Sequence, residues 1–126
     1  MITIDEMQEM LEDIVSEFPK EFFKELNGGI LLLEEAKLDP KSVRNDLYIM
    51  GQYHRGGSMG RYISIYYGSF QKLYGHFSEE KIRKRLRETV KHEFTHHLES
   101  LAGERSLERE DEIFMMNYLN KHKSDK

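Results

Sequence analysis

No cysteine occurs among the 126 residues of the chain. This absence excludes disulfides, thiolate metal sites and cysteine nucleophiles, so only imidazole and carboxylate groups remain as strong metal ligands. Long apolar runs are missing too: none approaches the roughly 20 residues that cross a bilayer, and the N-terminus carries acids where a secretory signal carries positive charge. The sequence therefore predicts a cytoplasmic protein that has no membrane partner.

A basic surface is also lacking. The formal net charge is −4, and lysine and arginine are scattered except in residues 81–87 and 121–126. Because nucleic-acid-binding proteins usually present a basic face, we expect no nucleic-acid partner. The mixture of 38% apolar and 33% charged residues is typical of a globular protein, and the length predicts a single domain that spans residues 1–126.

The N-terminal part has the pattern of two helices. Apolar residues recur at spacings of three and four over residues 7–18, as on a helix with one face in a core. Thr3 and Glu6 can form a capping box at its start, and Pro19 interrupts its end. Residues 20–26 predict a second, short helix that a following Asn-Gly pair ends.

Three β-rich runs follow, at residues 30–33, 47–53 and 62–67. The glycine-dense residues 54–60 connect the last two runs, which predicts that these two strands pair antiparallel. The third run alternates tyrosine or serine with isoleucine, so its two faces differ.

A long helix is predicted after Ser78, which can cap it, and Gly103 is its natural end. Its apolar stripe is formed by Ile82, Leu86, Val90 and Leu101. A last helix is predicted from Ser106, with an inward stripe of Leu107, Phe114 and Tyr118. The whole pattern predicts an α+β protein with N-terminal helices, a short three-stranded sheet that contains an antiparallel pair, a long helix and a C-terminal helix.

The segment from His92 to His96 is an HExxH motif inside the long helix. Residues four apart on a helix lie one above the other, so both imidazoles can bind one Zn²⁺ at about 2.0 to 2.1 Å. Glu93 is rotated by about 100° from His92, so it flanks the ion without binding it. Glu93 is therefore the predicted catalytic base, which takes a proton from a water on the metal and returns it to a leaving amine.

A chance occurrence of the motif in a charged helix is the alternative interpretation. Against it, His96 projects close to the stripe of Ile82, Leu86 and Val90, where an imidazole without a partner would be costly. His97 lies at the wrong angle to join the same ion, so we expect it to pack or to make a hydrogen bond.

Residues 26–33, 66–70 and 92–104 resemble the small bacterial zincin-like metallopeptidases, which are also described as minimal zincins. The resemblance covers nearly the whole chain, although only HExxH carries chemical specificity. It implies a minimal zincin-like fold and a Zn²⁺-dependent peptidase.

The third metal ligand departs from the pattern of related zincins. Short-spaced members place it ten residues after the first histidine, where this chain has Ala102, which cannot bind metal. An acidic residue on the following helix would replace it, and Asp111 is the first choice because it falls on the predicted inward stripe, with Glu104 and Glu108 as alternatives. Glu99 lies about 10 Å from the first histidine along the helix axis, which predicts a salt bridge or a hydrogen bond to an imidazole.

The predicted function is peptide-bond hydrolysis by a zinc metallopeptidase, with the substrate extended along the edge of the strand at residues 62–67. The alternative is a catalytically weak or inactive protein that uses the same scaffold to bind a peptide or protein. A metal-dependent ribonuclease is a third hypothesis, which the acidic net charge disfavours.

Overall fold

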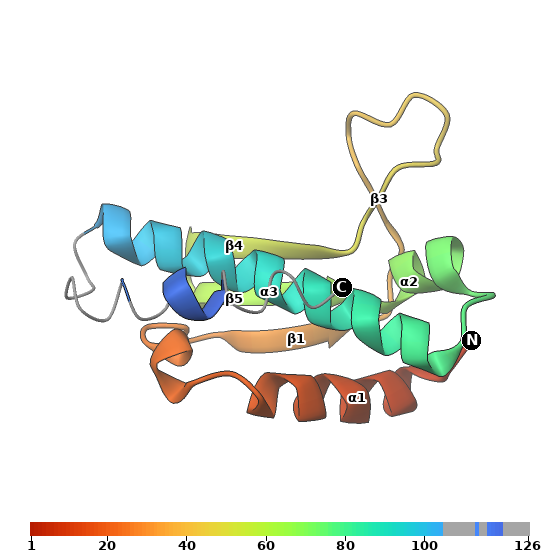
Figure 1. Cartoon of the computed structure of the whole chain (residues 1–126). Coiled ribbons are helices and arrows are strands. Elements are labelled where there is room, and N and C mark those ends of the chain that lie inside the picture. The colour runs from red at the N-terminus through yellow and green to blue at the C-terminus, as the bar shows by residue number, and fades with distance from the viewer. Residues whose placement is uncertain (105–112, 114–115, 120–126) are drawn as a thin grey trace.

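The structure is a computed structural model that describes residues 1–104, 113 and 116–119 of the chain. In chain order its elements are α1 (Ile4–Ser16), the 3₁₀ helix η1 (Lys20–Phe23), β1 (Gly29–Leu33), β2 (Lys37–Leu38), β3 (Tyr48–Ile49), β4 (Gly51–Gly57), β5 (Gly60–Tyr66), α2 (Tyr67–Tyr74) and α3 (Glu79–Gly103), as Figure 1 shows. The predicted α+β class is confirmed. The C-terminal helix predicted from Ser106 begins outside the described residues.

The capping box predicted at the start of α1 is confirmed. The Thr3 hydroxyl accepts a hydrogen bond from the Glu6 N–H, and the Glu6 carboxylate accepts one from the Thr3 N–H. These reciprocal bonds satisfy two of the donors that a helix start leaves unpaired. The second helix is shorter than predicted: η1 ends at Phe23, and Glu25 has a φ of 58°, which a right-handed helix cannot contain.

The main sheet has the strand order β1-β5-β4, so β5 is central and β4 lies at an edge. Strand β1 pairs with β5 in parallel, and β4 pairs with β5 antiparallel, which confirms the predicted antiparallel pair. The prediction that β5 offers its edge to a substrate is wrong, because hydrogen bonds to neighbours occupy both of its sides. The two edges of the sheet belong to β1 and β4.

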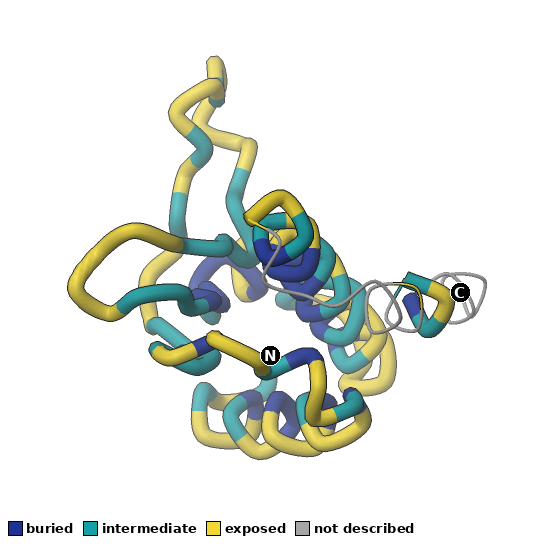
Figure 2. The backbone as a smooth tube through the Cα atoms, turned by 90° about the vertical axis from the view of Figure 1, so that its left-hand side faces the viewer, coloured by how far each residue is buried: buried dark blue, intermediate teal, exposed yellow. Residues whose placement is uncertain are grey.

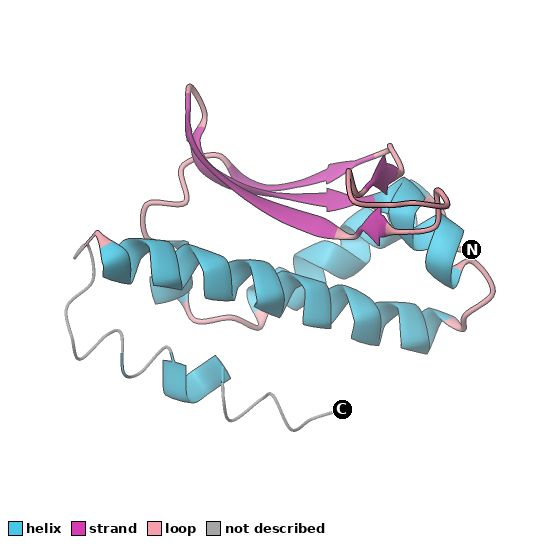
Figure 3. Ribbon diagram, turned by 90° about the horizontal axis from the view of Figure 1, so that it is seen from above, coloured by secondary structure: helices cyan, strands magenta, loops and turns pink. Residues whose placement is uncertain are grey.

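Helices α1 and α3 both pack on one face of this sheet, as Figures 1 and 3 show. The buried stretches face inward between these helices and the sheet, which Figure 2 shows in dark blue. The core contains Met7, Leu11, Ile14, Phe22, Ile63, Ile65, Phe70, Ile82, Leu86, Val90 and Phe94. The predicted difference between the faces of β5 therefore holds for its isoleucines, which enter this core.

Strands β2 and β3 form a separate two-stranded antiparallel ribbon that the sequence pattern did not predict. Each strand has only two residues, which is too short for an alternating pattern to be recognised. Between them, residues 39–47 form the loop that stands away from the body of the protein in Figure 1. Val43 in this loop is 93% exposed.

Helix α3 begins and ends where the sequence predicts. The Ser78 hydroxyl accepts a hydrogen bond from the Lys81 N–H, and the last helical residue is Gly103. The predicted stripe of Ile82, Leu86, Val90 and Leu101 is buried. In the described part of the chain, no helix combines the length and apolar character needed to cross a membrane.

Candidate functional site

The imidazole rings of His92 and His96 face each other on the exposed side of α3. Their Nε2 atoms are 3.1 Å apart, and the ring planes are nearly perpendicular, at 89°. The four-residue spacing brings the rings together, as predicted for one turn of helix. Partial burial lowers the pKa of His92 below its usual 6.5, and the nearby His96 lowers it further. His92 is therefore mostly neutral at pH 7 and has a lone pair available for a metal.

Glu93 lies on the side of α3 that faces β4. Only 5% of this residue is exposed, and burial raises the pKa of its carboxyl group above the usual 4.5. Gly51 of β4 permits the close approach, because a Cβ at that position would be 3.3 Å from Glu93 Cγ and 2.8 Å from Thr89 Cγ2. A raised pKa suits a group that must first accept and then return a proton.

An open groove separates β4 from the exposed side of α3. Its larger part has a volume of about 830 Å³ and is lined by residues that include Tyr53 and Arg55 of β4 and the candidate residues of α3. A smaller hollow of about 400 Å³ adjoins it, and both are lined by Gly51, His92 and Glu93. His92 and Glu93 thus lie where the two parts of the groove meet, and His96 lines the larger part.

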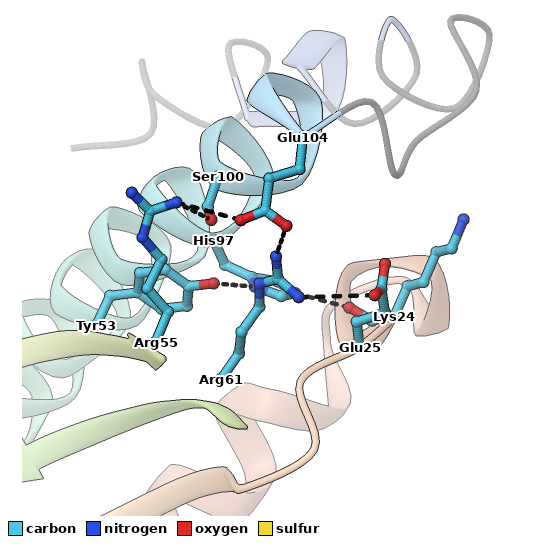
Figure 4. Close-up of polar contacts among 8 residues, drawn as sticks. All are labelled: Lys24, Glu25, Tyr53, Arg55, Arg61, His97, Ser100 and Glu104. Atoms are coloured by element: carbon cyan, nitrogen blue, oxygen red, sulfur yellow. Dashed lines mark hydrogen bonds and ion pairs between the residues drawn. The ribbon is translucent and has the colours of Figure 1, made fainter. Parts of the chain in front are cut away.

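The buried histidine of α3 is His97 and not His96, which is exposed. His97 Nε2 donates to the Lys24 carbonyl oxygen at 2.8 Å, so its Nδ1 accepts from the Tyr53 hydroxyl at 2.9 Å (Figure 4). Burial lowers the pKa of His97, which favours this neutral form. The prediction that His97 packs and makes hydrogen bonds is confirmed. The prediction that His96 projects close to the apolar stripe is wrong, because the step of about 100° per residue turns His97 toward the core instead.

Two arginines hold Glu104 at the C-terminal end of α3, as Figure 4 shows. Arg55 lies 3.3 Å from one carboxylate oxygen of Glu104 and 3.0 Å from the Ser100 hydroxyl, while Arg61 pairs with the other carboxylate oxygen. Arg61 also lies 3.6 Å from Glu25. These contacts raise the pKa of Arg61, the Glu104 hydrogen bond most of all. Glu104 therefore ties α3 to the β4–β5 hairpin and is poorly placed to serve as the third metal ligand.

The remaining ligand candidates cannot be placed in the same way, since Asp111 and Glu108 lie outside the described residues. Within residues 1–104, 113 and 116–119, no group of three or more histidine, aspartate or glutamate side chains is arranged to hold a metal ion. The structure thus brings His92, His96 and Glu93 together and leaves the third ligand at Asp111 a prediction.

A solved structure resembles this chain in sequence and in fold. It is described as a conserved hypothetical protein from "Thermo thermophilus", and the two chains share 32% identity and a TM-score of 0.72 over 81% of this chain and 99% of that one. This chain belongs to the same family. No protein-family model and no curated protein matches the chain.

These findings correct the predicted membership of the minimal zincin family. No model of such a family matches, the relative is described only as hypothetical, and the described residues hold no three-ligand metal group. Two glycines in the stretches that suggested the resemblance have packing roles. A Cβ at Gly28 would lie 2.6 Å from the Tyr62 Cβ, and one at Gly68 would lie 2.5 Å from the Ala36 N. Close packing therefore explains these glycines without reference to that family.

Tyr53, Arg55 and Arg61 were missed by the sequence analysis. Their partners are distant in the chain, as with Tyr53 and His97 at a separation of 44 residues. The two-residue spacing of Tyr53 and Arg55 could have shown that both point to one face of a strand. It could not have shown which helix that face meets.

Proposed function

We propose that this protein is a zinc-dependent hydrolase of peptide bonds in which Glu93 is the general base. The observation that carries the proposal is the 3.1 Å separation between the Nε2 atoms of His92 and His96, beside a buried carboxylate and inside an open groove. We would not expect these three features to occur together if the motif had arisen by chance on a solvated helix face.

The histidine pair fits a zinc ion. For Zn–N bonds of about 2.0 to 2.1 Å at a tetrahedral angle, the two nitrogens would lie about 3.3 Å apart. The observed 3.1 Å is close to this separation. We propose that His92 and His96 hold the ion together with Asp111, since catalytic zinc sites usually have three protein ligands.

When bound, zinc would supply a Lewis acid that polarises the scissile carbonyl group and makes water more acidic. Glu93 accepts the proton of the attacking water on a carboxylate oxygen and then donates it to the leaving nitrogen. Its raised pKa makes the carboxylate a stronger base, which favours the first of these transfers. The close approach of Gly51 to the Glu93 Cγ leaves the side chain at the wall of the groove, beside the two imidazoles.

The free edge of β4 supports a peptide as the substrate. An extended chain can add to such an edge through backbone hydrogen bonds, which requires no particular side chains. Gly51, Gln52 and Tyr53 of this strand line the same groove as Glu93. A peptide bond laid along β4 would therefore pass the carboxylate and the two imidazoles.

The test compares metal content and turnover in the parent and three variants. We expect the parent to bind zinc, measured by elemental analysis after dialysis, and to cleave members of a peptide library in a chelator-sensitive way, measured by mass spectrometry. His92→Ala should lose the metal, and Glu93→Gln should keep the metal but lose cleavage. His76→Ala is the matched control, because His76 is exposed and does not line the groove. Unchanged cleavage by Glu93→Gln would refute the proposal.

The alternative function is a module that binds a peptide or protein without cleaving it. The observation in its favour is that no group of three side chains among the described residues is arranged to hold a metal ion. It predicts that Glu93→Gln and the parent bind the same peptides with equal affinity and that the parent cleaves none of them.

A further inference from the structure

The groove between β4 and α3 carries an excess of negative charge. Its two adjoining parts are lined by five carboxylates, Asp39, Glu88, Glu93, Glu99 and Glu104, and by two guanidinium groups, Arg55 and Arg85. A groove of this composition attracts cations and repels anions. Where a cation binds depends on which carboxylate is free to contact it.

Both arginines of the groove already have carboxylate partners. Arg55 lies 3.3 Å from Glu104, and Arg85 lies 3.3 Å from Glu88. Their charges are therefore largely cancelled within the protein, so neither is well placed to attract an acidic substrate. The uncompensated charge of the groove comes from the other carboxylates.

Three carboxylates remain, and they differ in what they contact. The Asp39 carboxylate accepts a hydrogen bond from the Lys41 N–H, which uses it to shape its own loop. Glu93 is buried beside the histidines and is the proposed general base. Glu99 is exposed, and among the described residues it makes no hydrogen bond and no ion pair, so the predicted salt bridge or hydrogen bond to an imidazole is not formed there. Its charge acts on His92 only by opposing the lowering of the His92 pKa by burial and by His96. Glu99 is thus the carboxylate that a bound cation could neutralise without breaking an existing contact.

Its position places Glu99 next to the site of the proposed reaction. It follows His96 by three residues and His92 by seven, so the three side chains share one face of α3. At about 1.5 Å of rise per residue, Glu99 lies about 4.5 Å beyond His96 along the helix axis. Glu99 follows Glu93 by six residues, so it lies about 9 Å beyond Glu93 along the axis. One residue of an extended peptide spans about 3.3 Å, so Glu99 is within reach of a residue two or three positions from the bond that passes Glu93.

The direction of a bound peptide follows from the direction of β4. Gly51 at the start of β4 lies against Thr89 and Glu93, whereas Arg55 near its end contacts Ser100 and Glu104, so β4 and α3 run the same way. An added strand pairs slightly more stably in the antiparallel sense. A peptide antiparallel to β4 has its N-terminal part at the Arg55 end of the groove, which is the end that Glu99 lines.

We propose that Glu99 is a specificity-determining residue that selects substrates with a cationic group on the N-terminal side of the cleaved bond. The group is either a lysine or arginine side chain or the ammonium group of the substrate's own N-terminus. This inference rests on the proposed function and names the substrate class of the same groove: basic peptides, bound in extended form along β4.

The test uses zinc-loaded full-length protein and peptides that carry one lysine, glutamine or glutamate at each position around the cleaved bond. We expect kcat/KM to be about 5-fold or more higher for lysine than for glutamine at one position N-terminal to the bond, and lowest for glutamate, as for the loss of one ion pair. Glu99→Gln should remove this preference, and Glu99→Lys should reverse it. Acetylation of the peptide N-terminus distinguishes the two sources of the cationic group, because it removes the N-terminal ammonium group and leaves a lysine side chain charged.

Two controls separate this role from other roles of the same residue. Glu9→Lys makes the same charge change on an exposed part of α1 and should leave the lysine preference unchanged. Zinc affinity, measured by calorimetric titration, should be the same in Glu99→Gln and the parent. A loss of zinc affinity would make Glu99 a metal ligand and would overturn the inference. An equal rate for all three peptides that N-terminal acetylation leaves unchanged would also overturn it, as would a lysine preference confined to the C-terminal side.

Failure of the proposed hydrolysis can be told apart from failure of this inference. If the parent cleaves no peptide, the same peptides are titrated into Glu93→Gln and the fluorescence anisotropy of a label is measured. Tighter binding of the lysine peptides that disappears in Glu93→Gln/Glu99→Gln supports the role of Glu99 in a non-catalytic groove. Equal binding of lysine and glutamate peptides that N-terminal acetylation leaves unchanged overturns it.

Discussion

Helix α3 has one face toward the core and one toward the groove, and different kinds of residue form the two faces. Ile82, Leu86, Val90, Phe94, His97 and Leu98 form the core face, and each is at most 2% exposed. Arg85, Thr89, His92, His96 and Glu99 line the groove and retain exposure to solvent. The adjacent His96 and His97 show the contrast directly, since one contacts a second imidazole on the groove side and the other is hydrogen-bonded inside the protein.

On this helix, the residues that stabilise the fold and the residues of the candidate site lie on different faces. Burial of apolar surface on the core face stabilises the fold. Side chains on the groove face have few contacts to lose, so they can be replaced with little change in stability. Substitutions on the two faces should therefore give different measurable results.

The largest effect on stability is expected from Phe94→Ala. Phe94 is fully buried, and its ring packs against Phe18, Phe22 and Phe23 at centroid distances of 5.0, 5.4 and 5.2 Å. Removal of the ring leaves a cavity, which should lower the free energy of unfolding by about 3 to 5 kcal/mol. Urea denaturation measures the loss. Phe77→Ala, at a 37% exposed position, is the control and should cost far less.

A smaller but sharper contrast is expected between His97→Ala and His96→Ala. The first change leaves the Lys24 carbonyl and the Tyr53 hydroxyl without their partner, which should cost about 2 to 3 kcal/mol. The second should change stability by less than about 0.5 kcal/mol but abolish zinc binding. Denaturation and metal titration of both variants decide the matter. Equal destabilisation by the two changes would contradict the division of α3 into two faces.

Gly51→Ala should disturb the contact between β4 and α3 beside the groove. The new methyl group would meet Thr89 Cγ2 at 2.8 Å and push β4 away from Glu93, at a cost of about 1 to 2 kcal/mol. The rate of peptide cleavage should fall further than the loss of stability alone would cause, because the Glu93 carboxylate changes position. Thr89→Ser removes the obstructing methyl group and keeps the hydroxyl that bonds to the Arg85 carbonyl. The double variant should therefore recover stability, and failure to do so would show that the clash lies elsewhere.

Among the substitutions at buried contacts, the smallest loss of stability is expected from Tyr53→Phe. It removes only the hydroxyl that donates to His97 Nδ1, so about 0.5 to 1.5 kcal/mol of stability should be lost. Tyr62→Phe is the matched control, because the ring of Tyr62 stacks on His54 at 4.3 Å while no hydrogen bond of its hydroxyl occurs within the described residues. Thermal unfolding of the two variants side by side should show a difference in Tm, whereas equal Tm values would mean that the bond to His97 contributes nothing.

Elements whose signals lie close together in the chain could be predicted from the sequence. The capping box at Thr3 and Glu6, the cap at Ser78 and the end of α3 at Gly103 each depend on residues within one or two turns. The hairpin of β4 and β5 was predicted for the same reason. Strands β2 and β3 were not, because two-residue strands are defined by their partner and not by their own pattern.

The candidate site was predictable only along α3. The spacing of His92 and His96 and the neighbouring Glu93 follow from helix geometry alone. The strand that forms the other wall could not be identified, because strand order in a sheet depends on contacts between distant segments. β5 was expected at the edge and lies at the centre, since β1 adds to its other side.

The sequence by itself determined the α+β class, the limits of α3 and the meeting of two imidazoles one helical turn apart, because local hydrogen bonds and the helical repeat fix all three. Only the tertiary structure decided that β4 is an edge strand, that His97 is the buried histidine of α3 and that Glu99 makes no ion pair within the described part of the chain. These properties depend on which surfaces are removed from water when distant segments pack, and packing is a property of the whole chain.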